Sequence, residues 1–387
     1  MAESDTVISL KLQASVFALV SAAFTTIYIT QPVLPVIQAT YQISAARSSA
    51  TISAVILGVT LANLPFGTLA DRWAIRPIIL LGSLMVVGAN IVCTITESFP
   101  TLVAARFVQG LFIPALTTCL AAFLARHLPP QRVNVVMGTY VSATVAGGLG
   151  GRLLGGLFHS LLHWRWAFVV AAALVALACL VAWTWLPRAK RALVRPSAKM
   201  GFLHLLAQGP LLKNYLVAFC AFFVFSSIYN YLPFYLSGPK FNTPTRTITL
   251  MYLAYLIGIL VGPLAGQMSN RFGNGRTMAA ATVLFGLSLG LTLYPALITV
   301  GIGLAGICAG FFTIHAAAAG WLNRHLVASR GRANSLYVLF YYAGGACGIT
   351  LSGRAYEAYA WTGVIGLGLV MLLVPLGIGL RGAATEQ

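Results

Sequence analysis

The feature that most constrains this chain is a succession of apolar runs, each about twenty residues long, separated by short polar segments. A helix needs ~20 apolar residues to cross the ~30 Å hydrocarbon core of a bilayer. Runs of this length predict twelve membrane-spanning helices, at residues 13–37, 48–69, 78–96, 100–124, 133–157, 166–186, 211–236, 247–268, 277–295, 299–322, 333–354 and 361–380. Only 8% of the residues are charged, against roughly 25% in soluble domains, so a soluble fold is excluded.

The basic residues predict an orientation. Lys and Arg number 24 against 6 Asp and Glu, and they are scattered between the apolar runs. A nucleic-acid-binding protein would gather them in one patch or arm. Seventeen of the basic residues fall on the side of the two termini and seven on the other. Because Lys and Arg accumulate in cytoplasmic loops, both termini are expected in the cytoplasm.

One long connection divides the chain into six spans and six. It covers residues 187–210, is rich in Arg, Lys and Pro, and its basic run is typical of a face near lipid headgroups. We therefore expect an N-terminal six-helix bundle at residues 1–186, a cytoplasmic linker at 187–210 and a C-terminal six-helix bundle at 211–387. The six cysteines lie within apolar runs without metal-ligand spacing, so we expect them to pack and bind no metal.

The two halves repeat each other at an offset near 200. The segment GTLADR at 67–72 is echoed by GQMSNR at 266–271, and YITQPVLP at 28–35 by YNYLP at 229–233. Gly151-Arg152 in the fifth span is matched with Gly353-Arg354 in the eleventh. Duplicated bundles of one orientation predict an all-α membrane protein with twelve transmembrane helices in two pseudo-symmetric six-helix bundles. Such bundles hold a transported solute between them near the midplane.

Several motifs resemble those of the major facilitator superfamily, and the resemblance covers essentially the whole chain. Between the second and third spans the sequence supplies Gly67, Asp71, Arg72 and Arg76, with Ala74 and Ile75 at positions where the family has Gly and a basic residue. The fourth span has Arg106, Gln109 and Gly110, and the fifth has a glycine-rich stretch common in the family's antiporters. The Gly-Pro pair typical of its exporters is absent.

Within that superfamily, SLYVLFYYAGG at 335–345, His315 and the Trp164-Arg165 pair resemble bacterial permeases labelled as sugar or drug efflux proteins. The resemblance implies a transporter in the bacterial inner membrane and no enzyme. We expect a monomer whose partners are a small-molecule substrate, protons and membrane lipids, with no cofactor and no nucleic acid.

The loop motif is predicted to latch the cytoplasmic gate. An aspartate beside helix ends accepts hydrogen bonds from a helix N-terminus and from neighbouring arginines. In the second copy Asn270 replaces the acid. The predicted latch residues are Gly67, Asp71, Arg72, Arg76 and Arg271.

Arg106 and Arg152 both lie inside predicted spans. Arg106 falls ~9 Å below the outer boundary at 1.5 Å per residue. Intramembrane charges usually face a water-filled path, which makes Arg106 a candidate for the substrate site. The alternative is a structural group bound to carbonyls of the first helix. Arg152 lies ~28 Å along its span, close to the outer interface where an arginine can snorkel. Both a structural and a functional role are open for it.

His315 is the one histidine deep inside a predicted span. A histidine titrates near neutral pH, so it can carry a proton between the two sides. It can equally donate a neutral hydrogen bond in the core. No carboxylate falls within a predicted span, which makes His315, after Asp71, the candidate for proton coupling.

Polar and aromatic residues near mid-span are candidates for the substrate path. They are Tyr28, Gln31, Gln109, Tyr140, Tyr229, Asn230, Tyr255, Asn334, Tyr337 and Tyr341. Intramembrane positive charge without a buried acid favours a neutral or anionic ligand, since a buried cation would lack a partner. A cage of tyrosines around a cation is the alternative.

We therefore predict a secondary active transporter, working by alternating access and coupled to protons for efflux of a neutral or anionic compound. The alternative is a uniporter or a proton-symport importer of a small organic anion. The chain has no GxxxxGK[ST] loop, so ATP hydrolysis is not expected to drive it. A membrane enzyme would need a catalytic cluster, and His159 with His163 lacks a neighbouring acid.

Overall fold

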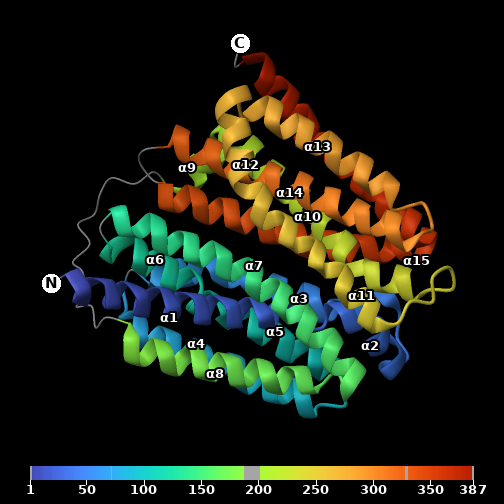
Figure 1. Ribbon diagram of the computed structural model, residues 1–387, viewed down its shortest axis with the longest axis horizontal. Helices are drawn as coiled ribbons and strands as arrows, with labels where there is room; N and C mark the ends of the chain where they lie inside the picture. The colour runs from blue at the N-terminus through green and yellow to red at the C-terminus, as the bar shows by residue number, and fades with distance from the viewer. Residues whose placement is uncertain (1, 71, 129, 187–200, 327–329, 386–387) are drawn as a thin grey trace. The chain divides into compact units, whose positions relative to one another are not determined.

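The fold is built from helices (Figure 1). The computed structural model describes residues 2–70, 72–128, 130–186, 201–326 and 330–385, and these ranges contain α-helices and 3-10 helices but no strand. Ten of the described segments are long and apolar enough to cross a membrane. One of these ten segments contains two helices joined at a kink, which gives eleven helices. Helix α13, which is not among the ten, is the twelfth. The described helices thus account for the predicted twelve, which confirms the all-α membrane fold.

The first half contains eight α-helices and one 3-10 helix in the described ranges. They are α1 (Ala2–Tyr28), η1 (Gln31–Val33), α2 (Leu34–Tyr41), α3 (Ala45–Leu69), α4 (Ile75–Ile95), α5 (Phe99–Leu116), α6 (Thr118–His127), α7 (Pro130–Leu161) and α8 (Trp166–Trp185). The first predicted span is broken after Tyr28, because Pro32 and Pro35 lack the N–H that continues a helix. The last turn of α1 and its link to η1, residues 26–31, are called the α1 break.

The second half is built in the same way. Its helices are α9 (Phe202–Ala207), α10 (Gly209–Ser237), α11 (Thr245–Met251), η2 (Tyr252–Tyr255), α12 (Leu256–Phe272), α13 (Asn274–Leu291), α14 (Leu297–His325) and α15 (Arg330–Thr385). The last two predicted spans are joined in α15, which kinks at Tyr359 and at Ala360 with φ 50°. The ring of Trp361 stacks on Tyr235 at 4.6 Å, and its Nε1 donates to Thr292 Oγ1 at 3.1 Å. These contacts fix the turn between the two helices.

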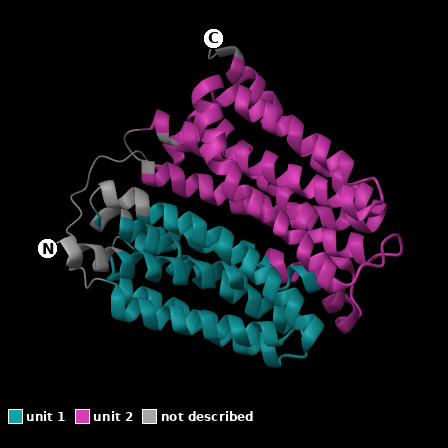
Figure 2. Cartoon of the chain, viewed as in Figure 1, with its two compact units in different colours: residues 1–33, 54–195 teal, residues 34–53, 196–387 magenta. Residues whose placement is uncertain are grey.

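The chain forms two compact units (Figure 2). The first comprises residues 1–33 and 54–195, and the second residues 34–53 and 196–387. The hairpin of residues 34–53 therefore belongs to the second unit, whereas the predicted N-terminal bundle includes it. In that unit α2 packs on α10, and Asn230 Nδ2 donates to Ser49 Oγ at 2.8 Å. Residues 187–200 of the predicted linker lie outside the described residues.

A ladder of glycines presses α7 against α1 in the first unit, where the two helices lie side by side (Figure 1). A Cβ on Gly147, Gly151 or Gly155 would overlap the main-chain oxygens of Ser21, Thr25 and Ile29 respectively. Small residues at every fourth position let helix backbones approach closely. Thr25 adds a hydrogen bond from its Oγ1 to the carbonyl of Gly147 at 3.2 Å.

The second unit repeats this ladder between α15 and α10. A Cβ on Gly344 or Gly348 would overlap the main-chain oxygens of Phe219 and Phe223. Gly151 and Gly348 thus occupy equivalent places. The predicted match of Gly151 with Gly353 was in the wrong register, because the repeated feature is the four-residue spacing that meets the partner backbone. Gly353 lies instead against Tyr231 and Ala46.

Replacing a ladder glycine with alanine is expected to destabilise its unit. Gly151→Ala and Gly348→Ala each force the helices apart, at a cost of about 1–3 kcal/mol for overpacking. The measurement is the apparent melting temperature in detergent. Gly88→Ala and Gly366→Ala are matched controls, since nothing lies within 4 Å of a Cβ at either position. They are expected to be neutral or slightly stabilising. Equal melting temperatures for ladder and control variants would contradict the ladder.

Candidate functional site

Arg106 is fully buried on α5 and binds the end of α1. Its Nη1 donates to the carbonyl of Thr26 at 2.6 Å, and its Nη2 to that of Ile27 at 2.5 Å. These carbonyls belong to the last turn of α1, where the helix dipole favours a positive charge. The guanidinium also lies 5.7 Å from the centre of the Phe168 ring. Arg106 is thus bound to carbonyls of the first helix. This is the structural alternative that the sequence analysis set beside a substrate-binding role.

A chain of amide side chains continues from Arg106. Its Nη1 also donates to Gln109 Oε1 at 2.6 Å, and Gln109 Nε2 donates to Asn90 Oδ1 at 3.0 Å. Asn90 Nδ2 ends the chain on the carbonyl of Val86 at 3.0 Å. Gln109 and Asn90 are both fully buried. Asn90 was missed from the sequence, because its partner lies 19 residues away on the next helix.

Arg152 binds the same α1 break from α7. Its Nε donates to Gln31 Oε1 at 2.6 Å, its Nη1 donates to the carbonyl of Gly148 at 2.7 Å, and its guanidinium lies 4.0 Å from the centre of the Tyr28 ring. The side chain is only 1% exposed, so the guanidinium packs inside the unit and does not snorkel to solvent, while its predicted depth near the outer interface stays a prediction. α7 extends to Leu161, roughly 14 Å beyond Arg152 at 1.5 Å per residue.

The first unit therefore places two buried guanidinium groups at one interruption of a helix. Each of the hydrogen bonds just described ends on a neutral carbonyl or amide oxygen. The described acidic side chains, Glu97 and Glu357, are exposed. The α1 break is consequently a positively charged region within a membrane-spanning bundle.

His315 provides the polar centre of the second unit. It is half-buried on α14, and its Nδ1 lies 2.9 Å from the hydroxyl of Tyr337 on α15. The His315 ring also lies 5.2 Å from Tyr341 and 6.1 Å from Phe311. The structure thus brings together three residues predicted for the path, because His315 contacts both Tyr337 and Tyr341.

The other predicted path residues of this unit lie further along α10 and η2. Tyr229 is fully buried, and its hydroxyl lies 2.9 Å from Cys308 Sγ. Its ring packs on Tyr255 at 4.7 Å. Asn230 faces the hairpin residue Ser49 and is fully buried. In the first unit Tyr140 is half-buried on α7, and Tyr28 and Gln31 belong to the α1 break.

The predicted latch residues are only partly described. Asp71 lies outside the described residues, and its role stays a prediction. Arg76 donates from Nε to the carbonyl of Leu186 at 3.1 Å, which ties α4 to the end of α8. Gly67 is half-buried at the end of α3.

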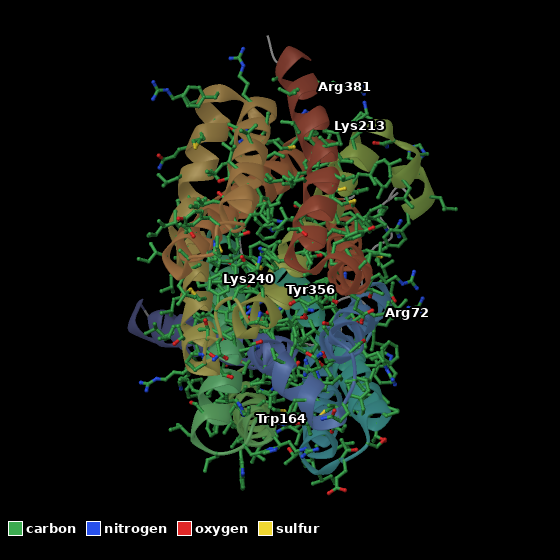
Figure 3. The ribbon with its side chains drawn as sticks, turned by 90° about the vertical axis from the view of Figure 1, so that its right-hand side faces the viewer. Arg72, Trp164, Lys213, Lys240, Tyr356 and Arg381 are labelled. Carbon is green, nitrogen blue, oxygen red and sulfur yellow. The ribbon has the colours of Figure 1, made fainter. Side chains whose placement is uncertain are left out.

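The second copy of the loop motif shows a contact that the sequence did not predict. Asn270, which replaces the acid, accepts a hydrogen bond at 2.8 Å from Arg324 on α14. Arg271 lies over the Phe272 ring at 5.1 Å. Figure 3 labels the exposed residues Arg72, Lys213, Lys240 and Arg381.

The region of His159 and His163 has no feature of a catalytic cluster. The backbone N–H of Arg165 donates to His163 Nδ1 at 3.3 Å. Desolvation and the nearby charge of Arg165 lower the pKa of His163.

The sequence matches the family model of the Major Facilitator Superfamily at residues 16–263 and 240–381. The chain belongs to this superfamily. It is therefore a membrane transporter and not an enzyme. The twelve apolar helices long enough to span a membrane that the described residues provide agree with that assignment.

Curated relatives cover nearly the whole facilitator. The uncharacterized MFS-type transporter YybF of Bacillus subtilis (strain 168) is 25% identical over 370 residues, which cover 93% of this chain and 91% of that protein. The inner membrane transport protein YnfM of Escherichia coli (strain K12) is 28% identical over 380 residues, covering 96% and 90%.

Solved structures share the fold. A bacterial homolog of the human lysosomal transporter Spinster has a TM-score of 0.78 at 16% identity, covering 98% of this chain and 97% of that one. The nucleoside transporter NupG has a TM-score of 0.78 at 13% identity, covering 98% and 100%. The human organic anion transporter MFSD10 has a TM-score of 0.73 at 17% identity, covering 96% and 99%.

Replacing Arg106 with lysine is expected to destabilise the facilitator. A lysine keeps the charge but cannot present the planar fork that reaches two carbonyls and Gln109 together. Losing one charge-assisted hydrogen bond costs about 2 kcal/mol, or roughly 4–8 °C in a unit of this size. Thermal unfolding in detergent measures the loss, with the exposed Arg354→Lys as the matched control. An unchanged melting temperature for Arg106→Lys would contradict this structural role.

Proposed function

We propose that this transporter moves a neutral or anionic small organic solute across the bacterial inner membrane by alternating access. The single observation that carries the proposal is the pair of buried guanidinium groups, Arg106 and Arg152, at the α1 break. A cationic solute near two buried positive charges would be repelled and would lack a counter-ion. The inner membrane relative YnfM supports the location, and the distribution of basic residues supports cytoplasmic termini.

Arg152 is the arginine assigned to the solute path. Arg106 uses both terminal nitrogens on α1 carbonyls and Gln109, which makes it part of the scaffold. Arg152 is linked to Gln31 and to the ring of Tyr28, both at the α1 break. Its charge therefore acts on a solute beside the break, and an anion is attracted there without displacing a protein carboxylate.

Proton coupling is assigned to His315, and the direction proposed is efflux. A histidine side chain can accept and donate a proton, and Tyr337 provides the adjacent hydroxyl, 2.9 Å from Nδ1. In this proposal, protonation and solute binding alternate, so that an inward proton movement drives the solute outward. The loop motif with Asp71, Arg72 and Arg76 latches the cytoplasmic side, and Arg271 belongs to its second copy.

His315→Gln is expected to abolish transport driven by a pH gradient, because glutamine keeps a hydrogen-bonding side chain but does not titrate. The measurement uses proteoliposomes with an imposed pH gradient and five probes: benzenesulfonate, gluconate, uridine, glucose and tetraphenylphosphonium. The matched control is His325→Gln, an exposed histidine stacked on Trp321. Gradient-driven flux that persists in His315→Gln removes the histidine as proton carrier. Flux that the parent shows without any gradient favours uniport instead.

Arg152→Gln is expected to weaken the binding of anions selectively. The amide retains hydrogen-bonding capacity toward Gln31 but loses the charge, so affinity for gluconate or benzenesulfonate should fall about tenfold or more. Affinity for uridine should change much less. Equilibrium binding to purified protein checks this, with the exposed Arg354→Gln as control. A preferential loss of tetraphenylphosphonium binding would overturn the charge argument.

A further inference from the structure

A cluster of aromatic rings in the second unit is not explained by charge or by proton coupling. We define the aromatic wall as Phe222 and Phe225 of α10, Phe311, Phe312 and His315 of α14, and Tyr341 of α15. Each ring lies within about 6 Å of at least one other, centre to centre. The wall therefore extends across three helices.

Three pairs of its rings are nearly parallel, whereas Phe312 lies edge-on to Phe225 and Phe311. Phe222 stacks on Tyr341 with centres 3.8 Å apart and planes 14° apart. Phe225 stacks on Phe311 at 3.9 Å and 18°. His315 is nearly parallel to Phe311 at 14°, with centres 6.1 Å apart. Several rings are thus nearly parallel to one another. Another planar ring can stack on such a surface.

Two glycines make room for the wall. A Cβ on Gly345 would lie 2.7 Å from Phe222 Cδ1, and a Cβ on Gly258 would lie 2.8 Å from Phe312 Cζ. Both distances are shorter than any normal contact. A side chain at either glycine would therefore fill the space that the ring of Phe222 or Phe312 occupies. The wall depends on these two glycines.

One side of the wall is accessible. Phe312, His315 and Tyr341 are half-buried, while Phe222, Phe225 and Phe311 are at most 3% exposed. An accessible imidazole bonded to a tyrosine hydroxyl is unfavourable against hydrocarbon. The large exposed side chains of α14 that suit lipid are aliphatic, Ile298 and Ile302. The accessible side of the wall therefore belongs to the solute path.

We infer that the solute carries a planar aromatic ring that stacks on the aromatic wall. The inference rests on the proposed function, which makes the solute neutral or anionic, and it adds the class of its apolar part. Aromatic rings prefer stacked or edge-on partners over aliphatic groups of similar area. Phe312 and Tyr341 are the residues placed to contact the ring, beside the proton-carrying His315.

The test compares two anions of equal charge and similar size, benzenesulfonate and cyclohexanesulfonate, by equilibrium binding to the purified full chain. Benzenesulfonate is expected to bind about tenfold more tightly. Tyr341→Leu and Phe312→Leu should each remove most of this difference. The matched control Tyr294→Leu, an exposed tyrosine just after α13, should preserve it. Melting temperatures identify any variant that fails to fold.

Equal affinity of the two sulfonates, or binding of neither, overturns the aromatic inference. The proposed function is judged separately by gluconate, uridine and glucose, which lack a benzene ring. If these solutes are transported and the sulfonates bind equally, only the aromatic inference fails. If only tetraphenylphosphonium binds, the proposed function fails because this probe is a cation. The aromatic inference fails in the same result, because neither sulfonate binds.

Discussion

Direct contact between helix backbones is the interaction on which this structure depends. In each unit, glycines four residues apart meet main-chain oxygens of a parallel helix, α7 on α1 and α15 on α10. Within lipid the hydrophobic effect does little to hold helices together, and close packing takes its place. The ladder sets the position of Arg152, which follows Gly151 and lies against the α1 break. In the second unit it lets Phe222 lie against Gly345 and stack on Tyr341.

The buried charges follow from a second constraint, the membrane's penalty for unpaired polar groups. Arg106 and Arg152 avoid this penalty by donating hydrogen bonds to carbonyl and amide oxygens instead of carboxylates. An interrupted helix supplies such oxygens at its C-terminal end, where the dipole is negative. The arginines and the α1 break therefore stabilise each other. A carboxylate at the same place would neutralise the site, whereas neutral acceptors leave its positive potential available to a solute.

The apolar runs predicted the helices closely, as in α8, predicted at 166–186 and found at Trp166–Trp185. Features that depend on contacts distant in sequence were not predictable. The bond between His315 and Tyr337 links residues 22 positions apart, and the hairpin at 34–53 joins a unit formed mostly by the second half. The glycine spacing was visible in the sequence, but the Gly-Arg match suggested another register. The contacts of Arg152 were likewise hidden, because its hydrogen bond to Gln31 joins residues 121 positions apart.

The duplicated scaffold permits its halves to specialise. The first unit interrupts its ladder helix at the α1 break and places positive charge there, while the equivalent helix α10 continues unbroken through Pro233. Since α10 needs no cation at a helix end, its residues are free to present rings and amides. Arg354, which the sequence paired with Arg152, is accordingly exposed and takes no part in such a site. Each unit thus has its own kind of contact, positive charge at the α1 break in the first and flat rings in the aromatic wall of the second.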